Sequence, residues 1–282
     1  MRRGRNLEPS NQKMSELLNK QYNSVFSTPD ITMTIKYPKY FFGHPQGNTL
    51  SDINITLIII LIFCCIIDAI KTISQNSSGF PDEFPAVLLK QCSKSLAHPL
   101  QLLYKASLKT GEIPTDLKRA IITLIYKGGF RNLPKNYRPV VLASHIIKIL
   151  EKRFAKNIHQ FLETHQKMNP KQHGFSSGRS CLSKLLQHHN KILEELEKLN
   201  IVDVIYLDFA TAFDKVDHGI LLNKLKKIAI NGKIGVWIHN FLSNRQQYVA
   251  VNGKTSSEAQ VRSGVPQGSV LGSLLFLIHI LI

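Results

Sequence analysis

The chain has 282 residues, which is long enough to bury a hydrophobic core in one domain of two lobes. Its 36 Lys and Arg against 19 Asp and Glu leave a formal net charge of +17. This excess favours a polyanionic partner such as nucleic acid, with an anionic membrane surface or simple solubility as the alternatives. The four cysteines lack the spacing of a zinc site or a disulfide framework, and the basic start is followed by polar sequence. These features argue against a structural zinc and a cleavable signal peptide, and predict an intracellular chain in the cytoplasm, the nucleus or both.

Residues 1–50 are predicted to form a basic, irregular extension containing one short helix. Apolar residues at helical spacing place that helix over Lys13 to Phe26, where it packs or links. The uncharged apolar run Ile53 to Ile67 follows the extension. It is shorter than the roughly 20 residues that span a bilayer, so a buried helix or strand is expected, with membrane attachment as the alternative.

The next stretch alternates helical and strand patterns. Pro85 to Lys109 predicts a helix that Pro99 divides in two. Arg119 to Lys127 is a β-branched run that predicts a strand ending in a turn. Val140 to Glu163 predicts a helix with one apolar and one basic face. That basic face is expected to be solvated, and contact with a nucleic-acid backbone is the alternative.

The C-terminal third carries further elements. Ser180 to Leu199 predicts a strong helix that Ser180 caps. The apolar run Ile201 to Leu207 predicts a buried strand, and Leu221 to Phe241 predicts a helix broken at two glycines, Gly232 and Gly235.

Two more elements complete the chain. Alternation from Gln247 and the Asn252-Gly253 pair predict a hairpin whose second strand runs from Ala259 to Gly264. Val270 to Leu281 predicts a final helix that follows a turn.

Asp208 directly follows the predicted strand Ile201 to Leu207. An acid at the carboxyl edge of a buried strand lies where α/β sheets bind ligands, and its oxygens suit Mg²⁺. Asp208 is therefore a candidate metal ligand. The alternative is that it caps the following helix, as Asp often does.

The motifs along the chain resemble those of reverse transcriptases from non-LTR retrotransposons. Tyr206 to His218, followed by Gly264 to Gly272, looks like the first two palm motifs of that family. Supporting matches occur in the family's order: Gly111 to Pro114, Asn136 to Pro139, Gln172 to Phe175, Gly178 to Cys181 and Val251 to Gly253. The resemblance extends over about residues 75–282.

The resemblance implies an α+β polymerase right-hand fold, of which this sequence holds the fingers and a partial palm. Residues 51–200 would form a fingers-like region with a strand hairpin, and residues 201–282 a partial palm with inserted helices. The implied activity is RNA-directed DNA polymerisation with an RNA template, a DNA primer, dNTPs and Mg²⁺ or Mn²⁺.

The resemblance also assigns roles to single residues. Asp208 would be the catalytic acid, and it would bind metal together with the backbone carbonyl of Phe209. The nucleotide-binding residues would be Lys127, Arg138, Phe209, Ala212, Phe213, Gln267 and Gly268. Phe213 would exclude a 2′-hydroxyl, Lys127 and Arg138 would hold the triphosphate, and Gln267 would contact the nucleotide or the template base. The alternatives are a core aromatic for Phe213, solvated cations for Lys127 and Arg138, and a simple turn for the loop around Gln267.

The sequence departs from the family after Leu275. The family continues to a Tyr-x-Asp-Asp hairpin with the remaining metal carboxylates, whereas here His279 to Ile282 end the sequence. We therefore expect the chain to be inactive by itself and poorly soluble, because unpaired sheet edges associate. The alternative functions are a noncatalytic nucleic-acid-binding protein derived from the same scaffold and a membrane-attached basic protein.

Overall fold

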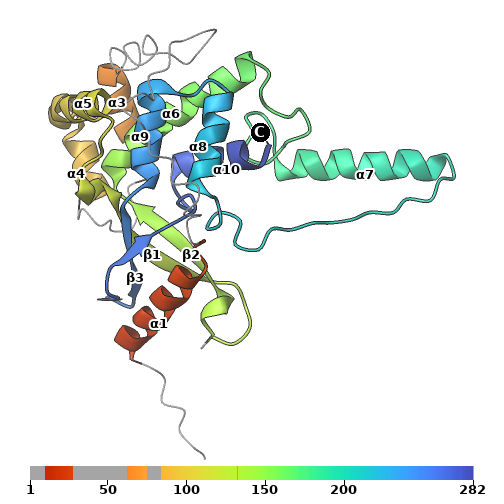
Figure 1. Ribbon diagram of the computed structural model, residues 1–282, viewed down its shortest axis with the longest axis horizontal. Coiled ribbons are helices and arrows are strands. Elements are labelled where there is room, and N and C mark those ends of the chain that lie inside the picture. The colour runs from red at the N-terminus through yellow and green to blue at the C-terminus, as the bar shows by residue number, and fades with distance from the viewer. Residues whose placement is uncertain (1–9, 28–61, 75–83, 132, 282) are drawn as a thin grey trace, which may run out of the picture.

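A mixed sheet and a cluster of helices make up most of the computed structural model, which describes residues 10–27, 62–74, 84–131 and 133–281 (Figure 1). Strand β1 (Arg119–Tyr126) pairs antiparallel with β2 (Tyr137–Ala143) and parallel with β3 (Arg245–Val251). Strands β4 (Lys254–Thr255) and β5 (Ala259–Val261) both pair antiparallel with β3. The predicted α+β class is confirmed, and so are the strand before Lys127 and the hairpin turn at Asn252-Gly253.

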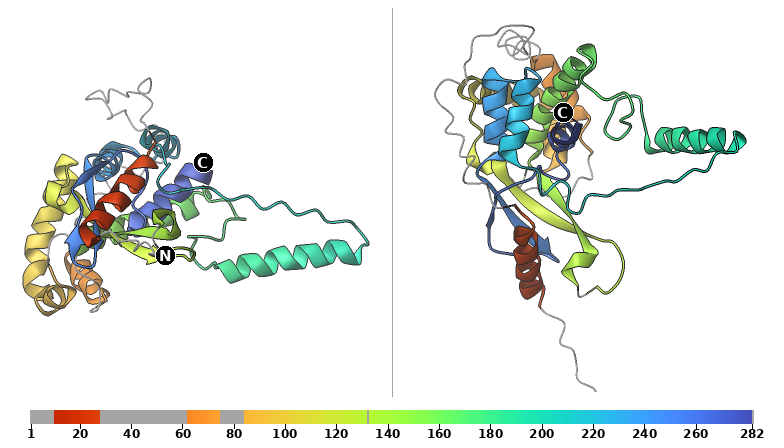
Figure 2. Two further views of the ribbon diagram at one scale, coloured as in Figure 1. Left: turned by 90° about the horizontal axis from the view of Figure 1, so that it is seen from below. Right: turned by 45° about the vertical axis from the view of Figure 1, so that its right-hand side comes forward.

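Helix α1 (Asn11–Ser24) lies across one face of this sheet (Figure 2). Its buried Leu18 and Tyr22 pack with Ile122 of β1 and Val249 of β3 as a second, smaller core. Polar contacts hold the helix in register, because both carboxylate oxygens of Glu16 accept hydrogen bonds from Ser257, at 2.6 Å from its N–H and 2.9 Å from its hydroxyl. The predicted helix over Lys13 to Phe26 is confirmed, with a packing role.

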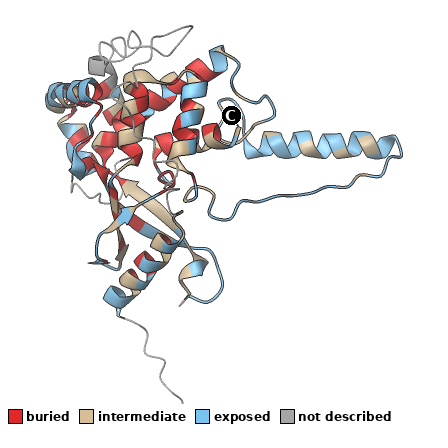
Figure 3. Ribbon diagram, in the orientation of Figure 1, coloured by how far each residue is buried: buried red, intermediate tan, exposed pale blue. Residues whose placement is uncertain are grey.

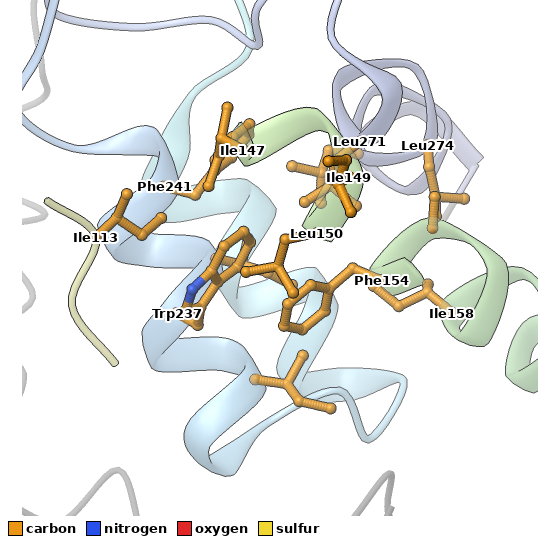
Figure 4. Packing of buried hydrophobic residues seen from close by; sticks show 14 of the residues in the cluster. Ile113, Ile147, Ile149, Leu150, Phe154, Ile158, Trp237, Phe241, Leu271 and Leu274 are labelled. Carbon is orange, nitrogen blue, oxygen red and sulfur yellow. The ribbon is translucent and has the colours of Figure 1, made fainter. Parts of the chain in front are cut away.

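The main core surrounds helix α6 (His145–Thr164), which begins at the N-cap Ser144. Around it pack α5 (Ser93–Thr110), α8 (His218–Lys227), α9 (Gly232–Leu242) and α10 (Val270–Leu281). Trp237 of α9 is fully buried and stacks on Phe154 of α6 at 4.3 Å between ring centroids and on Phe241 at 5.6 Å (Figure 4). Its indole N–H donates to Ser107 Oγ of α5 at 3.0 Å, so one side chain joins three helices.

Three predicted helix boundaries differ from the structure. The break in the first long helix falls at Cys92, between α4 (Ala86–Gln91) and α5, while the ring of Pro99 is exposed and fits within α5. Strand β2 takes the first residues of the predicted helix Val140 to Glu163, because they pair with β1. Gly235 lies inside α9, where its burial shows that it serves close packing.

Helix α7 (Cys181–Glu197) projects from the body, and the chain returns from its end as an extended segment (Figures 1 and 2). The capping box between Ser180 and Ser183 confirms the predicted start of the helix. None of its residues is buried, however, and Ile201 and Leu207 on the returning segment are 94% and 92% exposed (Figure 3). The predicted buried strand Ile201 to Leu207 is therefore wrong, because no strand within the described residues pairs with it.

The apolar run Ile53 to Ile67 lies only partly within the described residues. Residues 62–67 form the start of α3 (Ile62–Lys71), and residues 53–61 are outside the described part. Of the helices that the structure describes, none has both the length and the apolar character to cross a bilayer.

We predict that Trp237→Ala lowers the free energy of unfolding by about 3–5 kcal/mol, since it removes a large buried ring and its stacking partners cannot collapse into the space. Trp237→Phe keeps the stacking but removes the hydrogen bond to Ser107, and should cost about 1–3 kcal/mol. Urea unfolding followed by circular dichroism measures both, because Trp237 is the only tryptophan and its fluorescence disappears with it. Leu102→Ala on the exposed side of α5 is the control, with an expected change within about 0.5 kcal/mol.

Candidate nucleotide-binding site

The turn that follows Asp208 packs directly against the segment that begins at Ser263. The Val265 N–H donates to the Phe213 carbonyl at 2.9 Å, and the Gly264 N–H donates to the Val216 carbonyl at 2.8 Å. The hydroxyl of Ser263 donates to the Asp214 carbonyl at 2.8 Å. The structure thus brings together two sequence motifs that lie about fifty residues apart.

Gly264 permits this close approach. Its φ is +86°, and a Cβ at this position would lie 2.7 Å from the Phe213 carbonyl oxygen. A side chain would therefore meet backbone that cannot move aside, in a conformation that L residues rarely adopt. The contact between the two motifs requires glycine here.

His218 at the start of α8 adds a side-chain contact to the same junction. Its Nε2 lies 2.7 Å from the Gly264 carbonyl, which accepts, so the ring carries its proton on Nε2. Burial lowers the pKa of His218, and the hydrogen bond to Gly264 opposes that effect only in part. Asp217 caps α8 by accepting from the Ile220 N–H at 2.8 Å.

The loop from Pro266 to Ser269 is fixed against β2. The Val141 N–H donates to the Gln267 carbonyl at 2.8 Å. Gly268 has a φ of +113°, and a Cβ there would lie 2.8 Å from the Val141 carbonyl oxygen. Gly268 thus allows the loop backbone to lie on the strand backbone, with Gln267 half-buried and Gly268 exposed.

A buried carboxylate holds the other end of this loop. Glu151 of α6 is fully buried, and its Oε2 accepts from the Leu271 N–H at 3.0 Å, at the first turn of α10. An acid at a helix N-terminus is favoured by the helix dipole and satisfies N–H groups that have no partner within the helix. Burial raises the pKa of Glu151, and the hydrogen bond to Leu271 and the charge of Arg245 oppose that rise.

Arg245, at the start of β3, supplies the compensating charge. It is 3% exposed, its guanidinium donates to the Phe241 carbonyl at 3.2 Å, and it lies 5.1 Å from the centre of the Phe241 ring. Burial lowers the pKa of Arg245 to about 10, and the charge of Glu151 opposes that fall. Sequence analysis missed both residues. A useful signal was the position of Glu151 one helical turn after Ile147 and next to Leu150, on the apolar face of its helix.

Phe213 packs within the site. Its ring stacks on Phe276 of α10 at 4.6 Å between centroids, and the edge of Phe175 approaches it at 6.1 Å. Phe213 is half-buried, so it contributes to the core and still has an exposed side. Through Phe175 it also contacts the loop that precedes α7.

Lys127 and Arg138 lie at the hairpin of β1 and β2. The Lys127 N–H donates to the Asn136 carbonyl at 2.8 Å, and Arg138 lies opposite Ile125 in the strand register. Both side chains are exposed. Burial raises the pKa of Asp214, and the charge of Lys127 opposes this rise, so Lys127 acts electrostatically on the turn that contains Phe213.

Asp208 and Phe209 lie apart from this junction, on the exposed segment that returns from α7. Phe209 is 69% exposed, whereas Ala212 is half-buried beside Phe213. The expectation that Asp208 ends a buried strand is therefore wrong for the chain as described. Residues 10–27, 62–74, 84–131 and 133–281 contain no group of three His, Cys, Asp or Glu side chains placed to hold a metal ion. One exposed carboxylate does not fit a two-ion centre.

A cavity of about 40 Å³ lies beneath α1, lined by residues that include Asp214, Arg245 and Gln267. Pockets for ligands of nucleotide size have volumes of about 300 Å³ or more. This cavity is therefore too small for a nucleotide.

Comparisons with known proteins agree with the arrangement of motifs. The family model described as reverse transcriptase (RNA-dependent DNA polymerase) matches residues 125–281. The chain is 31% identical over 212 residues to a probable RNA-directed DNA polymerase from transposon BS of Drosophila melanogaster, covering 75% of this chain and 23% of that protein. It is 33% identical over 178 residues to the RNA-directed DNA polymerase from mobile element jockey of Drosophila funebris, and the match covers 63% of this chain and 19% of that protein.

A third relative is the retrovirus-related Pol polyprotein from type-1 retrotransposable element R2 of Popillia japonica. It is 29% identical over 167 residues, covering 59% of this chain and 23% of that protein. The chain thus spans less than a quarter of the length of each of these three relatives.

We predict that the folded chain loses stability as the pH falls below about 6.5, and that His218 contributes to this loss. Because the folded-state pKa of His218 is lowered, the unfolded chain binds a proton first as the pH falls, which favours unfolding. His218→Gln keeps a donor for the Gly264 carbonyl and should flatten the pH dependence between pH 7 and pH 5. Urea titrations at several pH values measure the free energy of unfolding and hence its pH dependence. His98→Gln, at an exposed position on α5, should leave the slope unchanged.

Proposed function

Because the chain belongs to the reverse transcriptase (RNA-dependent DNA polymerase) family, we propose that it forms the fingers and part of the palm of an RNA-directed DNA polymerase from a non-LTR retrotransposon. The observation that carries the proposal is the backbone contact between the Phe213–Val216 turn and Gly264-Val265. These segments belong to the two palm motifs that the sequence shares with the family.

The proposed roles are those that the resemblance to the family implies, and the position of each residue supports them. Lys127 and Arg138 bind the triphosphate, since both are exposed at the hairpin and Lys127 acts electrostatically on the Phe213 turn. Gln267 and Gly268 contact the nucleotide and the template base from a loop that is fixed at both ends. The backbone around Ala212 faces the triphosphate.

Phe213 is the proposed barrier to ribonucleotides. Its stacking on Phe276 restricts the ring, and a fixed ring beneath the sugar leaves no room for a 2′-hydroxyl. An RNA template and a DNA primer are the proposed partners, and the net charge of +17 is suited to both.

The reaction in this family generally uses divalent metal ions, which stabilise the attacking and leaving oxygens of nucleotidyl transfer. Asp208 and the Phe209 carbonyl are the ligands that we propose for Mg²⁺ or Mn²⁺ from this chain. We also propose a second function, which the net charge of +17 favours. This is a noncatalytic nucleic-acid-binding protein on the same scaffold, which would bind RNA in a salt-dependent way without synthesis.

Primer extension on an RNA template separates the two functions. Incorporation by the wild-type chain that Asp208→Asn lowers by about a hundredfold or more would overturn the expected inactivity and support the role of Asp208, because loss of even an outer-shell partner of a metal lowers activity by about 10–100-fold. Asp203→Asn makes the same charge change on the same exposed segment and should alter incorporation less than about threefold. Equal effects of the two variants would contradict the role of Asp208. RNA binding with no incorporation by the wild-type chain would favour the noncatalytic function.

The barrier role of Phe213 has its own test. We expect Phe213→Val to reduce the preference of the chain for dCTP over CTP, which differ only in the 2′-hydroxyl, by about tenfold or more, a change of about 1.4 kcal/mol in relative binding free energy. Competition between the two nucleotides for a fluorescent analogue measures the preference. Phe84→Val, at an exposed position before α4, is the matched control and should leave the preference unchanged. An unchanged preference in the Phe213 variant would show that the ring is only a core aromatic.

A further inference from the structure

A second pocket lies between α3, α5 and α6 and shares no lining residue with the candidate site. Its volume is about 340 Å³, which is within the range of small-ligand pockets. Helices α3 and α5 stand on the opposite side of the helical cluster from α7 (Figures 1 and 2). The pocket therefore opens on a surface that the proposed polymerase chemistry does not use.

Three cations from successive turns of α6 line this pocket: Lys152, Arg153 and Lys156. Lys152 and Lys156 are four residues apart, so their backbones are separated by about 6 Å along one face of the helix. The Nζ of Lys152 donates at 3.0 Å to Oγ1 of Thr72, the residue after α3, which holds Lys152 at the rim. The Nε of Arg153 is buried and has no hydrogen-bond partner among the described residues. Because this Nε is closed to solvent, it does not face the open pocket, and the pocket offers a ligand the positive charges of Lys152, Arg153 and Lys156.

The rest of the lining is mainly apolar and includes one carboxylate that can accept hydrogen bonds, that of Asp68. Its lining includes Ile66 and Ala69 of α3 together with Ile149 and Leu150 of α6. The hydroxyl of Tyr104 donates to the Ile146 carbonyl at 2.7 Å, so it is already satisfied. Asp68 is exposed and also lines the pocket.

We propose that this pocket binds one nucleotide of a single-stranded nucleic acid, with the phosphates on Lys152, Arg153 and Lys156 and the base on the apolar lining. Three cations beside one apolar pocket complement a ligand that joins negative charge to a flat, largely apolar ring. The Asp68 carboxylate can accept from the exocyclic amine of a base. The strand must be single because a base enters a pocket only when it leaves the stack.

This inference goes beyond the proposed polymerase function and does not depend on it. Binding would occur outside the site at the Phe213 turn, and needs neither a metal ion nor a nucleoside triphosphate. The pocket would hold the strand to the protein at a second point, away from the site of synthesis.

A charge-matched pair of triple variants of the full chain tests the proposal. The first variant is Lys152→Gln, Arg153→Gln and Lys156→Gln, and the control is Lys191→Gln, Lys227→Gln and Lys254→Gln at exposed positions on α7, α8 and β4. Both remove three positive charges. Fluorescence anisotropy with short single-stranded RNA and DNA oligonucleotides measures the dissociation constant over a range of salt concentrations, and circular dichroism checks the fold.

We expect the pocket variant to raise the dissociation constant by about tenfold or more. It should also lower the slope of log affinity against log salt by about 1.4, because each of the two phosphates that flank one nucleotide contributes about 0.7 on a single strand. The control should change the dissociation constant less than about threefold. An equal loss of oligonucleotide affinity in the pocket variant and the control would overturn the proposal. Loss of binding to phosphatidylserine vesicles with no loss on oligonucleotides would overturn it as well. The ratio of RNA to DNA affinity identifies the preferred strand.

A second variant tests the base without altering charge. Ala69→Leu fills part of the apolar lining, and remains informative if the triple variant does not fold. We expect it to lower the affinity for an intact oligonucleotide to that for an oligonucleotide with abasic sites, which should bind the wild-type chain about tenfold more weakly. If the wild-type chain binds both equally well, or Ala69→Leu leaves the difference intact, the pocket does not hold a base.

Discussion

The buried Glu151 carboxylate is the interaction on which the arrangement of this chain depends. It reaches from the centre of α6 to the first N–H groups of α10, and so connects the helix at the middle of the main core to the loop from Pro266 to Ser269. This buried carboxyl is tolerated because the Leu271 N–H donates to its Oε2, and the positive charge of Arg245 also acts on it. Among the described residues no ion pair joins the two side chains, and Glu151 Oε1 and Arg245 Nη2 are buried without hydrogen-bond partners. The hydrogen bond to Leu271 therefore ties α6 to the helix that follows the Gln267 loop.

Two glycines also fix the position of the loop that contains Gln267. Gly264 and Gly268 both have positive φ and lie against backbone, the first against the Phe213 turn and the second against β2. The loop between them is held by the sheet on one side and by the turn on the other. The candidate site is thus a junction of three backbone segments, with side chains such as Lys127 and Phe213 carried on its edges. Such a junction can position a ligand closely, because little of it can move independently.

The sequence predicted what depends on local patterns and missed what depends on distant partners. Strand β1, the turn at Asn252-Gly253 and helix α10 follow from period and turn residues. The strand over Ile201 to Leu207 failed for a physical reason, since a strand forms only when another strand accepts its hydrogen bonds. Glu151 was overlooked because an acid in a helix is ordinarily solvated, and only tertiary packing shows which N–H groups it meets.

The docking of α1 on the sheet has a consequence for synthesis of the chain. Glu16 and its partner Ser257 are 241 residues apart, so the helix leaves the ribosome well before the surface that receives it has been made. At about 5–20 residues per second, the delay is on the order of ten to fifty seconds. A helix of 14 residues is only marginally stable in isolation. Until β3 has been made, Leu18 and Tyr22 lack Val249, one of the two side chains that complete their small core. The nascent chain therefore exposes a short apolar segment of the kind that chaperones bind.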